Sequence, residues 1–139
     1  MRGRDSGHDL SDGLARPLFD HCTRSIELAL KRFSKRGLPL IGHGDWNDGM
    51  SAVGPLWKGE STWVGHFLYG ILLRWADVCD DVVARRTKIS GVIPARLTAA
   101  AKRYRARAAA LKTAINKHCW DGQWYWRASR DSGELVGSK

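Results

Sequence analysis

The chain has 139 residues, a formal net charge of +9 and a hydrophobic content of 43%. This length allows one domain, and the composition is typical of a globular rather than a disordered protein. The longest apolar run, Val64 to Leu73, is too short to span a membrane. Three widely spaced cysteines and a polar N-terminal segment without an apolar leader argue against a secreted disulfide scaffold, so we expect a cytoplasmic location.

The first predicted element is an amphipathic helix. Its apolar side chains recur at spacings of three and four, typical of one helix face, and they are Leu18, Cys22, Ile26, Ala29, Leu30 and Phe33. Pro17 suits its first turn and Gly37 suits its end, while Pro39 prevents continuation. The segment from Gly37 to Gly59 is rich in glycine and has no periodicity. Loops of this length inside a compact domain are commonly functional.

A second helix is predicted to start near Glu60 to Thr62 and to end at Arg85 to Lys88. Its apolar arc is wide, which indicates a helix buried among other helices; the positions are Val64, Phe67, Leu68, Ile71, Trp75, Val78, Cys79 and Val82. Gly65 and Gly70 lower its intrinsic helix propensity, so we expect tertiary packing to hold it together.

A third helix is predicted to end near His118. Its apolar positions follow a 4-3-4-3-4 rhythm and are Leu97, Ala101, Tyr104, Ala108, Leu111 and Ile115. After it, Asp121-Gly122 and residues 131–133 indicate two turns. Trp124 and Trp126 are expected to share one face of a short extended segment.

The predicted fold class is therefore all-α. Three helices cannot cover all of one another's wide apolar arcs, so we expect this chain to be a fragment of a larger helical architecture. The fragment is expected to contain a long Gly-rich loop and a short β-like C-terminal segment. The isolated chain is then expected to expose apolar surface.

The positive charge is concentrated in one segment. Between Val82 and Trp120 there are ten Lys or Arg residues and no acidic residue, whereas the rest of the chain has 13 basic and 14 acidic residues. The favoured interpretation is the solvated outer face of a helix. The alternative is a small basic helical module that binds nucleic acid or another polyanion through residues 85–117.

The segment from Gly42 to Met50 contains two carboxylates, an amide, an imidazole and an indole among glycines. A carboxyl group beside an indole in a partly dry pocket can keep its proton near neutral pH, as a general acid for a glycosidic oxygen requires. Two plainer interpretations stay open: Asp45 or Asp48 could cap backbone in a turn, and His43 could be an incidental loop residue. An EF-hand calcium loop is excluded, because its sixth and twelfth positions are Met50 and Leu56.

The segment from Gly37 through Gly44-Asp45-Trp46-Asn47-Asp48-Gly49-Met50 closely resembles the glycoside hydrolase family 94 phosphorylases, and most nearly the phosphorylase-like domains of cyclic β-1,2-glucan synthases. Four further segments resemble the family in the same order, and they are Leu18 to Cys22, Lys58 to Trp63, Trp120 to Tyr125 and Leu135 to Ser138. The resemblance covers residues 17–138. It divides the chain into residues 1–16, which match poorly, and a partial catalytic domain over residues 17–139.

The resemblance implies an (α/α)6 barrel in which Asp48 is the general acid and Trp46 lines a sugar subsite. It implies that Asp45, Asn47 and Glu60 shape the pocket. The implied reaction is inverting phosphorolysis of a β-linked glucan to α-glucose 1-phosphate, with inorganic phosphate as co-substrate in place of the activated water of an inverting hydrolase. No metal or other cofactor is implied.

The implied partners are a β-glucan oligosaccharide or polysaccharide and the rest of the parent catalytic domain, with no specific nucleic acid. The resemblance to the synthases also implies a membrane-anchored parent protein, with this region expected on its cytoplasmic side. The sequence departs from the family at Ser51-Ala52, where Asn-Arg is usual, and at Asp20, where Glu is common. Since the family's phosphate-binding residues lie outside the matched region, the 139-residue chain by itself is expected to be inactive.

Overall fold

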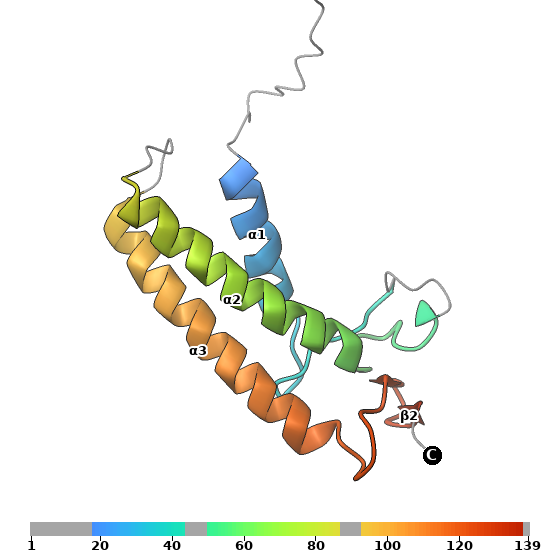
Figure 1. Ribbon diagram of the computed structural model, residues 1–139. Coiled ribbons are helices and arrows are strands. Elements are labelled where there is room, and N and C mark those ends of the chain that lie inside the picture. Colours follow the sequence, from blue (N-terminus) through green and yellow to red (C-terminus); the bar gives the residue numbers. More distant parts are fainter. Residues whose placement is uncertain (1–17, 44–49, 87–92, 138–139) are drawn as a thin grey trace, which may run out of the picture.

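The computed structural model describes residues 18–43, 50–86 and 93–137. This part of the chain is mainly helical, as predicted, with three helices: α1 (Leu18–Leu30), α2 (Thr62–Ala84) and α3 (Pro94–His118). A small antiparallel pair follows, formed by β1 (Ala128–Ser129) and β2 (Leu135–Val136). Figure 1 shows α2 and α3 side by side and antiparallel, with the hairpin near the start of α2. None of the helices in the described residues is long and apolar enough to cross a membrane.

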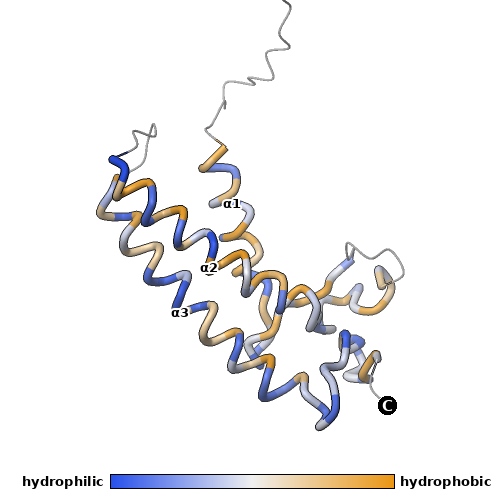
Figure 2. Tube along the Cα trace, viewed as in Figure 1, coloured by the Kyte–Doolittle hydropathy of each residue, from blue (hydrophilic) through white to orange (hydrophobic). Residues whose placement is uncertain are grey.

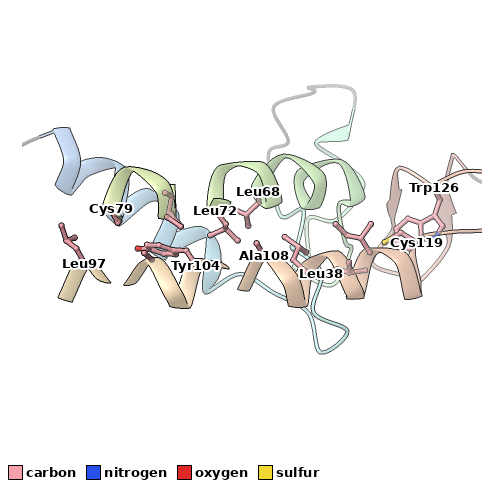
Figure 3. Packing of buried hydrophobic residues seen from close by; sticks show 14 residues of the cluster. Leu38, Leu68, Leu72, Cys79, Leu97, Tyr104, Ala108, Cys119 and Trp126 are labelled. Carbon is pink, nitrogen blue, oxygen red and sulfur yellow. The ribbon is translucent and has the colours of Figure 1, made fainter. Parts of the chain in front are cut away.

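The main core lies between α2 and α3. The six residues of the predicted stripe on α3 are its buried residues, and none is more than 7% exposed. From α2 they meet Leu68, Leu72, Ala76 and Cys79, as Figure 3 shows for several of these side chains. The two glycines of α2 differ in their surroundings. A Cβ atom at Gly65 would lie 3.1 Å from Ile115 Cδ1, whereas a Cβ atom at Gly70 would have no neighbouring atom within 4 Å. Gly65 therefore allows close helix packing.

The end of α1 differs from the prediction. The helix stops at Leu30, because the N–H groups of Lys31 and Arg32 bond to carbonyl groups three residues back and close a tight turn. Phe33 pairs instead with Pro39 in an isolated bridge, and Gly37 turns the chain with a φ of +80°. The chain thus doubles back three residues earlier than the apolar rhythm predicts.

A polar contact joins α1 to α3. The Tyr104 hydroxyl donates a hydrogen bond of 2.7 Å to Glu27 Oε1, and Arg103 forms an ion pair with the same carboxylate. Partial burial alone would raise the pKa of Glu27, but the hydrogen bonds from Tyr104 and Arg103 outweigh it and lower that pKa below its ordinary value. The buried Tyr104 hydroxyl therefore has its partner on the neighbouring helix.

Part of the wide apolar arc of α2 faces away from α3. Phe67 is 57% exposed and Val78 is 39% exposed, and Figure 2 shows hydrophobic residues along α1, α2 and the chain that follows α1. The stripe of α2 that meets α3 is therefore buried, while Phe67 and Val78 of its wide apolar arc are exposed in this chain, as expected for a part of a larger helical architecture.

We expect the 139-residue chain in solution to self-associate through this apolar surface, since exposed patches of this kind drive association. Sedimentation velocity should show species larger than a 15.5 kDa monomer, and an environment-sensitive dye should bind in the native state. Phe67→Glu should weaken both effects. A monomer that unfolds cooperatively and binds no dye would contradict this expectation.

Candidate active site

The candidate site is built on paired segments at the start of α2. Ile41 N–H donates to Gly59 O at 3.0 Å, and Gly42 pairs with Gly54 in an isolated bridge. These contacts bring the residues on either side of the intervening segment together as a stem, and Gly42 and Gly54 close the end of this stem. Leu38 is fully buried and anchors the incoming strand of the stem to the main core.

Four of the five predicted site residues lie in the intervening segment. Asp45, Trp46, Asn47 and Asp48 fall outside the described residues, so their predicted roles stay predictions. His43 and Met50, which flank them, are described, and Val53 N–H closes a turn onto Met50 O at 3.0 Å. The structure therefore describes the stem that carries the predicted acid.

The fifth predicted residue, Glu60, is 3% exposed and lies at the base of the stem. Its two carboxylate oxygens accept from Arg36, with a Nε to Oε1 distance of 3.1 Å. Hydrogen bonding to Glu60 raises the pKa of the Arg36 guanidinium above its ordinary value. Arg36 therefore neutralises the buried Glu60 carboxylate in an ion pair, and the predicted role of Glu60 in shaping the pocket stays a prediction. Sequence reasoning did not single out Arg36.

Asp131, which the sequence indicated only as a turn residue, contacts the returning strand of the stem. Its carboxylate accepts backbone N–H bonds from Leu56, Lys58 and Gly59 at 2.8 to 2.9 Å. Partial burial alone would raise the pKa of Asp131, but these three bonds and the charge of Lys58 lower it below its ordinary value. The hairpin turn and the stem are thereby tied together.

Trp57 lies between the residues that Asp131 holds, and its backbone has a φ of +60°. This left-handed conformation costs a bulky residue about 1–3 kcal/mol and persists only where its surroundings impose it. The Trp57 ring covers Gly42, because a Cβ at Gly42 would lie 2.6 Å from the ring. Arg32 stacks on the Trp57 ring at 4.9 Å, and the His43 ring meets its edge at 6.2 Å.

A cavity of about 680 Å³ opens beside this group, between α1, α2 and the stem. Its lining is largely apolar, with Arg32 and His43 as polar groups, and includes Trp57, Trp63, Phe67 and Ile71. Such a surface suits apolar packing or the face of a flat ligand. Among the described residues, no group of three His, Cys, Asp or Glu side chains is placed to hold a metal ion.

The C-terminal tryptophans do not share a face, contrary to the prediction. Trp126 is 2% exposed and its indole donates to His118 O at 3.0 Å, whereas Trp124 is 44% exposed. Asp121 Oδ1 accepts from the N–H groups of Gln123 and Trp124, which keeps Trp124 in the turn. The strand β1 begins only at Ala128, so Trp124 and Trp126 do not lie on one regular strand and their side chains need not point to the same face.

The Asp131 carboxylate gives a pH-dependent contribution to stability. Because its folded-state pKa is depressed, this contribution is present above the ordinary value of 3.8 and is lost as pH falls through the folded-state pKa. Asp131→Asn should reduce the free energy of unfolding at pH 6 but change it little near pH 2. Urea unfolding of both proteins across this range measures the difference, with Lys58, Arg130 and Glu134 as the neighbouring charges. An equal difference at both pH values would contradict the assignment.

Comparison with known proteins assigns the class. Residues 8–139 match the catalytic domain of the Glycosyl hydrolase 94 superfamily, and the chain belongs to this family.

Three relatives show the range of proteins to which the chain is similar. It is 36% identical over 121 residues to cyclic beta-(1,2)-glucan synthase NdvB of Rhizobium meliloti. This alignment covers 87% of this chain and 4% of that protein. It is 35% identical over 122 residues to cellobionic acid phosphorylase of Neurospora crassa, covering 88% of this chain and 14% of the relative. For solabiose phosphorylase of Paenibacillus borealis the identity is 31% over 121 residues, covering 87% and 14%. The chain thus spans a small part of each relative.

Proposed function

We propose that this chain is the acid-bearing part of a catalytic domain that carries out inverting phosphorolysis of a β-linked glucan. The products are α-glucose 1-phosphate and a glucan shortened by one residue. A β-1,2-linked glucan is the proposed substrate, since the relatives include a cyclic beta-(1,2)-glucan synthase. Two relatives named as phosphorylases support phosphate as the co-substrate.

The observation that supports the proposal is the closed stem formed by the residues that flank the family motif in the chain. Gly42 pairs with Gly54 at its base, and Asp131 and the Arg36–Glu60 ion pair brace the returning strand. A general acid must be held within hydrogen-bonding reach of the oxygen that it protonates. A loop that enters and leaves through a rigid stem meets this requirement better than one with free ends.

In the proposed reaction, the Asp48 carboxyl group protonates the glycosidic oxygen as the bond from that oxygen to the anomeric carbon breaks. A phosphate oxygen attacks the anomeric carbon from the opposite face, which inverts its configuration. The shortened glucan leaves with the proton of Asp48, and a proton from the phosphate or solvent restores the acid. Trp46 stacks on the sugar ring, while Asp45, Asn47 and Glu60 shape the subsite.

The test uses a polypeptide that contains this chain within a complete catalytic domain. It is incubated with β-1,2-glucan oligosaccharides or with cellobionic acid, with and without inorganic phosphate, and glucose 1-phosphate is measured. The proposal expects release only with phosphate and faster release from the glucan. Release of free glucose at the same rate without phosphate would contradict phosphorolysis, and a preference for cellobionic acid would contradict the proposed substrate.

The alternative, a polyanion-binding module on residues 85–117, is not favoured by the charge pattern. Arg105 forms ion pairs with Asp77 and Asp80 of α2, at 2.6 and 2.7 Å, and Arg103 pairs with Glu27 of α1. Arg107 lies over the Phe33 ring at 5.0 Å. Acidic side chains of neighbouring helices therefore offset part of the basic stripe.

We expect the chain to bind duplex DNA or RNA weakly and to lose this binding by about 0.2 M salt, since acidic side chains already pair with part of the basic segment. Fluorescence anisotropy with labelled duplexes at several salt concentrations measures this dependence. Tight, sequence-selective binding that survives physiological salt would favour the alternative function.

A further inference from the structure

Asp131 forms hydrogen bonds to residues that are far from it in the sequence. Its carboxylate accepts three backbone N–H groups from a segment that lies 72 to 75 residues earlier in the chain. The Asp131 N–H in turn donates to Val53 O at 3.3 Å. Asp121, in the preceding turn, accepts from the N–H groups of Gln123 and Trp124, which lie two and three residues away. The Asp131 contacts therefore join two distant parts of the chain.

The three donors flank Trp57 on both sides. Leu56 N–H bonds to Oδ2 before it, and Lys58 and Gly59 N–H bond to Oδ1 after it. A carboxylate that binds both neighbours fixes the backbone of the residue between them, and here that residue has the left-handed φ that a tryptophan rarely adopts. Non-glycine residues in this conformation cluster at sites where the strain serves a function.

The fixed backbone sets the position of the Trp57 ring. The ring covers Gly42, the last stem residue before His43, and no side chain at Gly42 could fit beneath it. Arg32 stacks on the ring at 4.9 Å and His43 contacts its edge. A substitution at Asp131 is therefore expected to affect Gly42 through two successive contacts. The first joins the Asp131 carboxylate to the backbone on either side of Trp57, and the second joins the Trp57 ring to Gly42.

We infer that Asp131 is a positioning residue for the proposed phosphorolysis, because its carboxylate holds Trp57 against Gly42 and so fixes the base of the loop that carries Asp48. This inference rests on the proposed function. Asp131 does not touch the reacting atoms; it acts through Trp57 and the stem. Because Gly42 precedes the segment that contains Asp48, a displaced Trp57 ring is expected to shift the backbone that leads into this segment and so to lower the rate of proton transfer.

The first test measures the structural effect of Asp131 directly and needs no enzyme activity. In the 15N-labelled 139-residue chain carrying Phe67→Glu to limit association, Asp131→Ala should shift the amide resonances of Gly42 and His43. It should also speed hydrogen exchange at Leu56, Lys58 and Gly59 by about 10-fold, as loss of a hydrogen bond allows. The matched control Asp121→Ala should change the resonances of Gln123 and Trp124 and leave those of Gly42 and His43 in place. If Asp131→Ala is poorly folded, the milder Asp131→Asn, which keeps one acceptor oxygen, should shift the same resonances less.

The second test separates positioning from stability in a complete catalytic domain that contains the chain. A 1 Å displacement of a catalytic group can lower the rate by up to 100-fold, so Asp131→Ala should reduce kcat by about 10- to 100-fold while KM changes little. Asp131→Asn should recover part of the loss. Trp57→Gly, which adopts positive φ without strain but has no ring, should lower kcat even with Asp131 present.

The outcomes distinguish the inference from the function on which it rests. Unchanged Gly42 and His43 resonances together with an unchanged kcat in Asp131→Ala would overturn the inference, and the proposed function would stand if Asp48→Asn still lowered turnover by about 100-fold or more. If Asp48→Asn kept full turnover while Asp131→Ala lost it, the proposed acid would be wrong, although the positioning role of Asp131 would be supported.

Discussion

Replacing Asp48 by asparagine in a complete catalytic domain should lower turnover by about 10² to 10⁴-fold, because a general acid contributes this much. Asparagine keeps the shape and a hydrogen-bonding group but has no proton to give. Glucan binding should therefore change little. Initial rates of glucose 1-phosphate release at several glucan concentrations separate kcat from KM and measure both expectations.

Two variants of the same motif provide controls. Asp45→Asn should cost much less than Asp48→Asn, since Asp45 is proposed only to shape the pocket. Trp46→Ala should raise KM as well as lower kcat, because the stacked ring contributes to binding the sugar. A large loss in Asp45→Asn with near-normal turnover in Asp48→Asn would assign the acid to the other carboxylate.

Leu72→Ala should lower the free energy of unfolding of the 139-residue chain by about 2–5 kcal/mol. Leu72 is fully buried between α2 and α3, where the loss of three carbon atoms leaves a cavity that its helical neighbours cannot readily fill. Urea unfolding followed by far-ultraviolet circular dichroism measures the change, at a concentration where association is negligible.

Leu28→Ala is the matched control. Leu28 lies on α1 and is 50% exposed, so the same truncation there should cost about 0.5 kcal/mol or less. Comparable losses in both variants would mean that the interface between α2 and α3 is not the core of the folded chain. A shallow transition in the unmodified chain would mean the same.

The helices were the most predictable part of the fold, because their side-chain periodicity is local. On α3 the 4-3-4-3-4 rhythm predicted all six buried residues, and Ser61 caps α2 where the sequence placed its start. The predicted end of α1 was three residues too late, because Phe33 continues the apolar rhythm but pairs with Pro39. A competing tertiary contact outweighed the periodicity at that end.

The residues that brace the candidate site were less predictable. Asp131 was recognised only as part of a turn, because its three bonds to the stem cross more than 70 residues of chain. Arg36 was not singled out, since its pairing with Glu60 depends on how the chain folds back after α1. For Trp57, a tryptophan between Gly54 and Gly59 was a signal that could have been used. The motif that contains Asp48 was found by resemblance to a family, and its geometry was not deduced from spacing.

The configuration of the product tests the central proposal most directly. Proton nuclear magnetic resonance of the reaction of a complete catalytic domain with a β-linked glucan and phosphate resolves the anomeric proton of the sugar phosphate as it forms. Inverting phosphorolysis predicts α-glucose 1-phosphate as the first product, appearing only when phosphate is present. The β-anomer as first product, or free glucose formed whether or not phosphate is added, would contradict it.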